Sequence, residues 1–515
     1  MSFRDSRPLF RPWALALLFW PSLLPYPYVL DGAFCALVAR RWSLGAALYR
    51  DVAEYRPPLT FLIWRVGIAL FGREHAHVGL EILFEGVTLT ALLAFAKRHW
   101  GVALASRAGL VLVATFVTVL TPTNTAETEI FCLPFIIATL AVAAAAQERF
   151  RLSSFTLLGF LAGSLGLLKI YPAALPLACA AWAVLESRLT GRRLALATGV
   201  FLLGLAAAVL PWLIWMWQEG ILSSFLEVGR EFAPGAAAPW HRYLSRPTGL
   251  LLVPAGLLLG LVKLLPEGVM AALVPVRLKG RMQPLDRLLL VMSGAALVLV
   301  AIQGKFYLYH FFLAVPSLAL LAARWWGAVL ESLPEAGQAR RRAVLVALVL
   351  IGPILCAARR WGAAALYATG RETYESYLQM VEDPGGTSLA PQYRLQARLA
   401  AELAPGTRVL VWGEAPGLLL PGDLAPASRY VEFVPYAVRG APPALLRSLV
   451  RALAERPPAR VVMMAQLVDP MDLDREETAR QIFDDCGLGE WLTAHYQRTT
   501  IDGPFELWLP RSAAQ

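Results

Sequence analysis

The sequence predicts an α-helical polytopic membrane protein, with about 11 transmembrane helices and a small C-terminal α/β domain. Hydrophobic residues make up 57% of the 515 positions and charged residues only 16%, a balance that is unusual for a soluble protein. Apolar runs of membrane-spanning length recur from residue 13 to about residue 358. After residue 358 the charge density becomes ordinary, and short strand-like and helix-like stretches follow one another.

The expected membrane spans follow from the lengths of these apolar runs. We place them at 13–30, 77–96, 106–121, 129–146, 153–170, 173–187, 194–216, 248–276, 288–303, 311–327 and 343–358. The stretch 248–276 is longer than one straight span needs. Pro254 and Pro266 therefore predict a break or kink in it.

The distribution of Lys and Arg predicts the orientation. The formal net charge is +10, but the basic residues form small clusters between the spans and no continuous face, so no nucleic-acid partner is expected. Arg4, Arg7 and Arg11 precede the first span, and placing them in the cytoplasm together with the later clusters makes the spans alternate consistently. The chain is then integral to the inner (plasma) membrane, with a cytoplasmic N-terminus and an extracytoplasmic C-terminal domain.

Two domains are therefore expected: a transmembrane domain over residues 1–358 and a soluble extracytoplasmic α/β domain over residues 359–515. In the second domain, apolar runs and one helical period predict strands at 408–413, 460–465 and 504–511 and a helix at 443–456. No phosphate-binding glycine loop accompanies them. Cys486 is the one cysteine well inside this domain, so no internal disulfide framework is expected.

Two long loops are expected on the outer side. In residues 31–76 charges interrupt the apolar positions too often for a span, which predicts one to three amphipathic helices in the outer interface. Residues 218–247 are rich in Gly, Pro and Ala, which predicts a flexible loop that orders over a ligand.

Asp31 directly follows the first expected span and has no basic partner in the adjacent sequence. A carboxylate at the membrane–water boundary is partly desolvated, so it keeps enough basicity to take a proton from a hydroxyl. A solvated helix end is the alternative interpretation.

The segment 49–59 combines two carboxylates, two arginines and two tyrosines with a proline pair that fixes the backbone. Arg56 is suited to hold a phosphate or pyrophosphate through its planar fork, and Asp51, Glu54 and Tyr55 are candidates to line the same cavity. An ordinary interfacial loop with snorkelling arginines is the alternative.

A third cluster lies at the outer end of the ninth span. Lys305 and His310 flank Tyr307 and Tyr309, and Lys169 adds a cation at the same expected depth. This combination suits a lipid phosphate entering from the bilayer edge, whereas an aromatic belt with one snorkelling lysine is the alternative.

Further carboxylates are expected inside or next to spans. Glu127 and Glu129 lie in one outer turn, and Glu81 and Glu85 share a helix face. Such residues form either a buried structural network or part of an active site; of the four, we assign Glu127 to the cavity. Because HExxH, CxxC and DxD patterns are absent from the outer loops, the sequence indicates no cofactor. A divalent metal is compatible with the sequence but not demanded by it.

Together these pieces resemble the GT-C glycosyltransferases, in the branch similar to bacterial protein mannosyltransferases and the lipid A aminoarabinose transferase. The resemblance covers roughly residues 13–330. It is carried by Asp31, by Gly45 to Asp51 followed by Arg56-Pro57-Pro58-Leu59 and Leu70-Phe71-Gly72, and by Asn124-x-x-Glu127, Gly159-x-x-x-Gly163 with Lys169, and Lys305 to His310 followed by Pro316.

The resemblance implies transfer of a sugar from a polyprenyl-phosphate donor to a hydroxyl on a lipid, glycan or protein acceptor, with inversion and at the outer face of the membrane. It implies Asp31 as general base and Arg56, with Lys305 or His310, as stabilisers of the departing phosphate. Two departures stand out. Many relatives carry a second acidic residue where this chain has Gly32, and a Lys where it has Arg56.

Two other functions stay open at this point. A transporter or flippase of a lipid-linked glycan would place ionisable groups near the bilayer midplane, often in repeated halves, and the sequence shows no internal repeat. A polysaccharide ligase or polymerase would share the same sidedness and lipid chemistry. The sequence does not specify the sugar, the acceptor, the oligomeric state or the role of the C-terminal domain.

Overall fold

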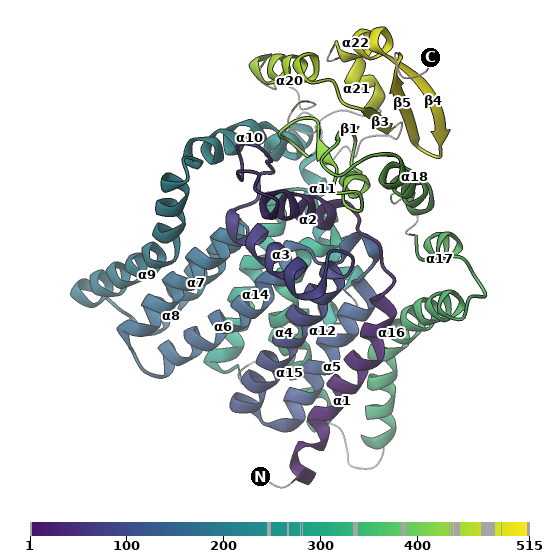
Figure 1. Ribbon diagram of the computed structural model, residues 1–515. Helices are drawn as coiled ribbons and strands as arrows, with labels where there is room; N and C mark the ends of the chain where they lie inside the picture. The colour runs from purple at the N-terminus through teal and green to yellow at the C-terminus, as the bar shows by residue number, and fades with distance from the viewer. Residues whose placement is uncertain are drawn as a thin grey trace.

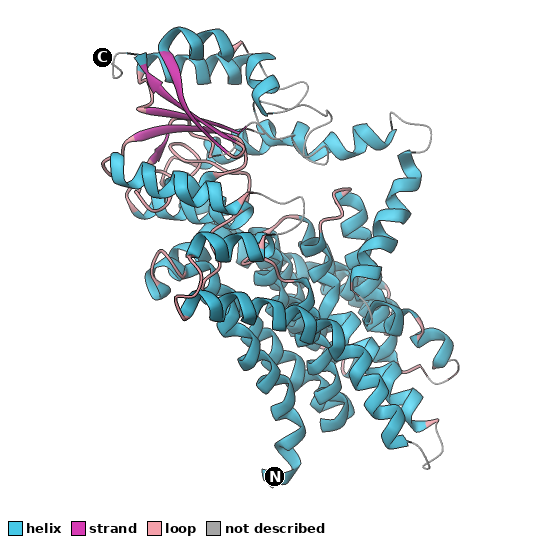
Figure 2. Ribbon diagram, turned by 90° about the vertical axis from the view of Figure 1, so that its right-hand side faces the viewer, coloured by secondary structure: helices cyan, strands magenta, loops and turns pink. Residues whose placement is uncertain are grey.

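The computed structural model describes residues 3–244, 249–264, 267–278, 280, 282–332, 338–382, 388–431, 433, 436, 443–464, 479–485 and 487–511. It is a bundle of helices with a small domain that contains a sheet at one end (Figures 1 and 2). The N-terminus lies at the opposite end of the bundle (Figure 1). The predicted fold class, a helical membrane protein with a C-terminal α/β domain, is confirmed.

Many of the helices coincide with the expected spans. They are α4 (Ala76–Trp100), α5 (Val102–Val119), α6 (Thr128–Glu148), α7 (Leu152–Leu168), α8 (Ala174–Glu186), α9 (Gly191–Gln218), α14 (Pro284–Gln303), α15 (Val315–Glu331) and α16 (Gln338–Ala368). Among the described residues, 7 helical stretches are long and apolar enough to cross a membrane, and further apolar helices are shorter. Because α16 continues to Ala368, one helix runs through residue 358, and the division of domains there stays a prediction.

The first expected span is displaced. Its helix, α1 (Phe3–Phe19), begins earlier than residue 13 and is followed by the 3₁₀ turn η1 (Trp20–Leu23). Prolines at 21, 25 and 27 explain the early end, because each lacks the backbone N–H that a continuing helix requires. The loop 31–76 holds two helices, α2 (Leu30–Ser43) and α3 (Pro58–Phe71), within the predicted number.

Helices α7 and α9 pack backbone against backbone. A Cβ atom on Gly159 would lie 1.9 Å from the carbonyl oxygen of Phe201, and one on Gly204 would lie 1.9 Å from that of Thr156. Neither position therefore tolerates even a methyl group. Lys169 directly follows the last residue of α7.

The expected long span 248–276 is broken, as its prolines predict. It consists of α11 (Leu252–Lys263), α12 (Glu267–Ala272) and α13 (Val274–Arg277), with residues 265–266 outside the described part. The prediction of a flexible loop at 218–247 is wrong, because residues Leu222–Leu244 form the helix α10. The helix forms in spite of the weak helical propensity of its prolines, and Arg429 of the C-terminal domain forms ion pairs with Glu227 and Glu231, one turn apart on α10.

The C-terminal domain begins with α17 (Tyr374–Val381) and α18 (Leu389–Glu402) and contains a five-stranded sheet of order β2-β1-β3-β5-β4. Strand β1 pairs in parallel with β2 and β3, whereas β5 is antiparallel to β3 and β4. The strands are β1 (Arg408–Trp412), β2 (Ala425–Pro426), β3 (Arg460–Met464), β4 (Tyr496–Asp502) and β5 (Phe505–Pro510), and the helices α20 (Pro443–Glu455), α21 (Ala479–Asp485) and α22 (Leu488–His495). The three predicted strands and the helix at 443–456 are present. Cys486 lies outside the described residues.

Candidate active site

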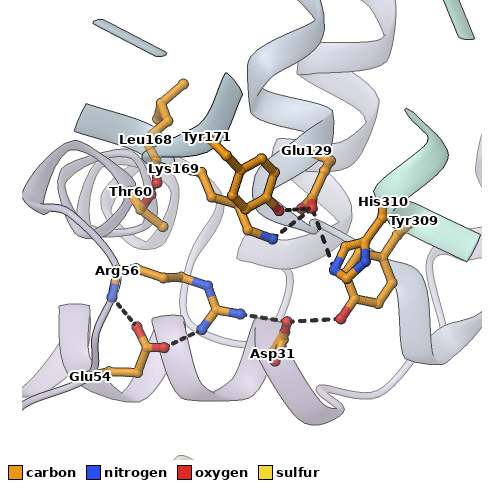
Figure 3. Close-up of polar contacts among 10 residues, drawn as sticks. All are labelled: Asp31, Glu54, Arg56, Thr60, Glu129, Leu168, Lys169, Tyr171, Tyr309 and His310. Carbon is orange, nitrogen blue, oxygen red and sulfur yellow. Dashed lines mark hydrogen bonds and ion pairs between the residues drawn. The ribbon is translucent and has the colours of Figure 1, made fainter. Parts of the chain in front are cut away.

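Charged and aromatic side chains from five segments meet at the end of the bundle that faces the C-terminal domain (Figures 1 and 3). Each segment is the end of a helix or a turn, where the backbone changes direction and a side chain can leave the helix stack. The contributors are Asp31 in the first turn of α2, Glu54 and Arg56 before α3, Glu129 in the first turn of α6, Lys169 after α7, and Tyr309 and His310 in the 3₁₀ helix η5 (Leu308–Ala314).

Arg56 lies between two carboxylates. Its Nη2 is 2.5 Å from Asp31 Oδ2 and its Nη1 is 2.5 Å from Glu54 Oε1, and its backbone N–H donates to Glu54 Oε2 at 2.9 Å (Figure 3). Tyr49 donates a hydrogen bond from its hydroxyl to the Arg56 carbonyl oxygen at 3.0 Å. Arg56 and Glu54 are buried, and Nε of Arg56 donates to no group within the described residues. The guanidinium is thus rigidly held and keeps a donor for a ligand.

Asp31 differs from Glu54 in its access and charge. Its side chain is 26% exposed, whereas that of Glu54 is fully buried. Burial acts to raise the pKa of Asp31, but the cations of Arg56, Lys169 and Lys305 outweigh it, so this pKa lies below its usual value. Burial dominates at Glu54 and raises the pKa of that carboxyl in spite of Arg56. Asp31 is therefore the more acidic and the more accessible carboxylate of the pair.

A second cluster surrounds Glu129. Its Oε1 accepts hydrogen bonds from Lys169 Nζ at 2.6 Å and Tyr171 Oη at 2.9 Å, and lies 3.9 Å from His310 Nε2 (Figure 3). Glu129, Lys169 and His310 are buried. Glu129 Oε2 and His310 Nδ1 form no hydrogen bond with any described residue. The sequence placed Glu129 in the same turn as Glu127 without assigning it to the site, and nothing in the spacing distinguishes its central position.

Aromatic side chains connect the two clusters. The hydroxyl of Tyr309 lies 3.5 Å from Asp31 Oδ2, and the Lys169 ammonium lies 5.8 Å from the centre of the Tyr309 ring. Tyr307 stacks on Tyr309 with 5.6 Å between ring centres. Of the predicted site residues in segment 303–310, Tyr309 therefore lies beside Asp31, and Lys305 contributes positive potential there.

Glu127 lies between the clusters, at the residue that precedes α6. Its side chain is buried and its Oε2 forms no hydrogen bond with any described residue. Burial, together with the carboxylates of Asp31 and Glu129, raises the pKa of Glu127 well above its usual value. The preceding residue, Ala126, donates its N–H to Glu81 Oε2 at 2.5 Å, so a buried carboxylate of α4 fixes this turn.

Two predicted cavity residues lie at the margin. Asp51 is about half exposed, pairs with Arg50 at 3.1 Å and accepts a hydrogen bond from the Ala47 N–H, so its contacts close the turn locally. Tyr55 is 39% exposed and its ring lies 5.1 Å from the Arg56 guanidinium carbon. The structure thus places Tyr55 beside Arg56 but does not bring Asp51 into either cluster.

Strained backbone occurs next to several site residues. Leu30, Tyr49, Ala126 and Phe306 have φ angles of 42°, 66°, 58° and 52°. A left-handed conformation costs free energy for residues other than glycine, and it persists where the surroundings enforce it, often at functional sites. No sequence signal marks these positions, because none of the four is a glycine or an asparagine.

Close packing explains the glycine where many relatives carry a second acidic residue. A Cβ atom on Gly32 would lie 3.3 Å from the carbonyl oxygen of Thr125 and 3.6 Å from the ring of Trp64. A side chain at this position would press against that carbonyl oxygen. Among the described residues, no group of three or more His, Cys, Asp or Glu side chains is arranged to hold a metal ion.

Comparisons with known proteins give similarities in sequence family and in fold. Residues 55–215 match the family model described as dolichyl-phosphate-mannose-protein mannosyltransferase. ArnT from Cupriavidus metallidurans bound to undecaprenyl phosphate is similar at 16% identity and a TM-score of 0.59, over 98% of each chain. The apo structure of ArnT from the same organism is similar at 15% identity and a TM-score of 0.57, over 97% of each chain. The archaeal oligosaccharyltransferase AglB from Archaeoglobus fulgidus is 11% identical with a TM-score of 0.46, over 90% of this chain and 70% of the AglB chain. No curated protein sequence matches significantly.

Proposed function

Since the chain belongs to the GT-C glycosyltransferase superfamily and has an ArnT-like fold, we propose that it transfers a sugar from a polyprenyl-phosphate donor to an acceptor hydroxyl. One observation carries this proposal above the others. A buried arginine with an unused N–H donor lies against an ionised, accessible carboxylate at the end of a membrane bundle. The arginine is suited to bind the phosphate of a lipid donor, and the carboxylate is suited to take the proton from the attacking hydroxyl.

The reaction is a single displacement with inversion. The acceptor oxygen attacks the anomeric carbon of the donor sugar, and the bond from that carbon to the phosphate oxygen breaks. The hydroxyl proton passes to Asp31, and the polyprenyl phosphate leaves with the bonding electron pair. Arg56 lies where negative charge develops on the leaving phosphate, and an oriented cation stabilises that charge most in a site shielded from water.

The Arg56–Asp31 ion pair gives the reaction an order. Without donor, the guanidinium beside Asp31 holds the pKa of that carboxyl low, which makes it a poor base. A phosphate bound to Arg56 competes for the same N–H groups and brings negative charge close to Asp31. Both effects raise the pKa of Asp31, so donor binding prepares the base before the acceptor reacts.

Two features support a lipid donor. The family matched by residues 55–215 is named for dolichyl-phosphate-mannose, and the similar ArnT structure holds undecaprenyl phosphate. We extend the proposal to topology: the N-terminus is cytoplasmic and the site and residues 359–515 are extracytoplasmic, as the distribution of basic residues predicts. Labelling of single cysteines placed near each terminus, in sealed vesicles, tests this orientation directly.

The decisive experiment measures transfer of radiolabelled sugar from a panel of polyprenyl-phosphate donors in membranes. We expect Asp31→Asn to lower the rate by about 10²- to 10⁴-fold, the contribution typical of a general base. Asp51→Asn is the matched control, because Asp51 lies in the same outer loop and makes only local contacts. Full activity of Asp31→Asn, at a normal level of membrane insertion, would contradict the assigned mechanism.

A further inference from the structure

The C-terminal domain forms hydrogen bonds with the segment that carries Arg56. The Ala53 N–H donates to the carbonyl oxygen of Arg429 at 2.7 Å, and the Val431 N–H donates to the carbonyl oxygen of Ala53 at 3.4 Å. Ala53 and Tyr430 thus form a parallel bridge between distant parts of the chain. Ala53 directly precedes Glu54, so this bridge fixes the backbone from which the Glu54–Arg56 pair projects.

A second contact joins the same domain to both helices that flank this segment. Asp423 accepts hydrogen bonds from Arg40 Nε and Nη2, each at 2.8 Å, and lies 3.0 Å from Arg73 Nη1. Arg40 belongs to the last turn of α2, and Arg73 follows the end of α3. The bidentate hydrogen bonds from Arg40, together with its charge, hold the pKa of Asp423 below its usual value. This carboxylate therefore joins the end of α2, which precedes the Arg56 segment, to the end of α3, which follows it.

A third contact lies just before Asp31. A Cβ atom on Gly417, in the turn η6 (Pro416–Leu419), would lie 3.2 Å from the carbonyl oxygen of Tyr28. Gln392 of α18 donates to that same carbonyl oxygen at 3.4 Å. The C-terminal domain thus touches the backbone shortly before Asp31 as well as shortly before Arg56.

Side chains of the bridging segment also hold α10. Arg429 lies 2.9 Å from Glu227 and 2.6 Å from Glu231, and the Tyr430 hydroxyl donates to Glu231. The ring of Phe232 on α10 packs between Tyr55 and Tyr430, with ring centres 5.1 Å and 5.4 Å apart. Residues 423–431 therefore contact three parts of the chain, namely the segment around Ala53, the ends of α2 and α3, and the helix α10.

We propose that residues 423–431 act as a clamp that holds Asp31 and Arg56 in register, with Asp423 and Arg429 as positioning residues. Segment 45–57 lies outside any helix of its own, so the C-terminal contacts supply part of its order. The effect of the clamp on transfer rests on the proposed function, whereas its effect on the order of the first outer loop does not. A displacement of about 1 Å at a reacting centre lowers the rate by about 10²-fold.

Amide hydrogen exchange followed by mass spectrometry tests the clamp in the full-length protein. We expect Asp423→Asn and Arg429→Gln to increase deuterium uptake in peptides covering residues 45–56. Asp502→Asn is the matched control, because Asp502 forms its bidentate ion pair with Arg394 inside the C-terminal domain. Arg40→Gln removes the Asp423 contact from the opposite side and should reproduce the Asp423→Asn result.

The same variants are then assayed for transfer. We expect kcat to fall by about 10- to 100-fold in the clamp variants, with a smaller change in the apparent KM for donor, and no such loss in Asp502→Asn. Unchanged uptake over residues 45–56 in both clamp variants, in protein that elutes as a single species, would overturn the clamp. Absence of transfer by the native protein would instead count against the proposed function and leave the exchange result standing.

Discussion

The two charged clusters of the site differ in what they leave unpaired. In the cluster of Asp31, Glu54 and Arg56, the arginine is shared between the two carboxylates. One N–H of its guanidinium makes no hydrogen bond with any described residue. In the cluster around Glu129, the ammonium group of Lys169 pairs with Glu129 Oε1. The groups without a hydrogen bond among the described residues are Glu129 Oε2 and His310 Nδ1. An unpaired N–H attracts a phosphate, whereas an unpaired carboxylate oxygen repels it.

This comparison separates residues for which the sequence analysis predicts the same role. Arg56, Lys169 and His310 were all predicted to bind the donor phosphate. Arg56 can change partner from Asp31 to a ligand without leaving a charge unpaired, since Glu54 stays in place. Lys169 would have to abandon the buried Glu129, and an unpaired buried charge is costly. Its role as a phosphate ligand stays a prediction, and the geometry favours Arg56 as the first ligand.

Within this comparison of the two clusters, the largest expected effect is that of Arg56. Arg56→Lys keeps the charge but loses the planar fork, and we expect transfer to fall by about 10²- to 10³-fold, as on loss of one oriented donor. Binding of a fluorescent polyprenyl phosphate, measured on the same preparation, should weaken in parallel. Arg50→Lys serves as the control, because Arg50 lies in the same segment, is exposed and pairs with Asp51 outside both clusters. Unaltered phosphate-lipid binding by Arg56→Lys would remove the distinction drawn between the clusters.

The next expected effect concerns Lys169 and takes the form of a double-mutant cycle. Lys169→Met leaves Glu129 buried without its cation, so we expect a loss of about 3–5 kcal/mol of stability. Lys169→Met with Glu129→Gln should recover most of that stability. Thermal unfolding and transfer are measured on Lys169→Met, on Glu129→Gln and on the double variant. If the cluster around Glu129 is purely structural, the double variant recovers activity together with stability. If it recovers stability alone, Lys169 binds the donor phosphate.

The part of the site that could be predicted consists of residues whose chemistry depends on local position. Asp31 after an apolar run and Arg56 before a proline pair are recognisable from the adjacent sequence, and in the structure each lies at or just before the start of a helix, α2 or α3. The comparisons support the GT-C resemblance that these residues carry, at the level of superfamily and fold. The contact between them was not predictable. It depends on the backbone between α2 and α3, which contacts with the C-terminal domain hold in place.

The failures have a common physical origin in contacts between distant segments. Glu129 was missed because its partners Lys169 and Tyr171 lie 40 and 42 residues further along the chain. The helix α10 was predicted as a loop because its prolines dominate local propensity, while Arg429 stabilises it from the far end of the chain. Strand β4 was missed because its polar residues lack the apolar run that marks the buried strands.

The smallest expected effect concerns Glu127, the carboxyl group between the two clusters. Because burial and the neighbouring carboxylates raise its pKa, the folded protein keeps a proton that the unfolded chain releases above about pH 4.3. This group therefore destabilises the native protein increasingly as pH rises, until the pH passes its folded pKa. Glu127→Gln cannot ionise, so its melting temperature relative to that of the native protein should rise between about pH 5 and about pH 8.

Asp51→Asn provides the control of opposite sign for this pH dependence. Burial acts against it, but the hydrogen bond from Arg50 lowers the pKa of Asp51, so that carboxylate adds stability above its unfolded pKa and loses it in acid. Its removal should therefore cost most at neutral pH, and only slightly because the side chain is half exposed. A difference between Glu127→Gln and the native protein that shrinks as pH rises would mean that Glu127 is ionised in the folded state. The site would then hold one more negative charge between its clusters, and Arg56 and Lys169 would both be needed to balance it before a phosphate could bind.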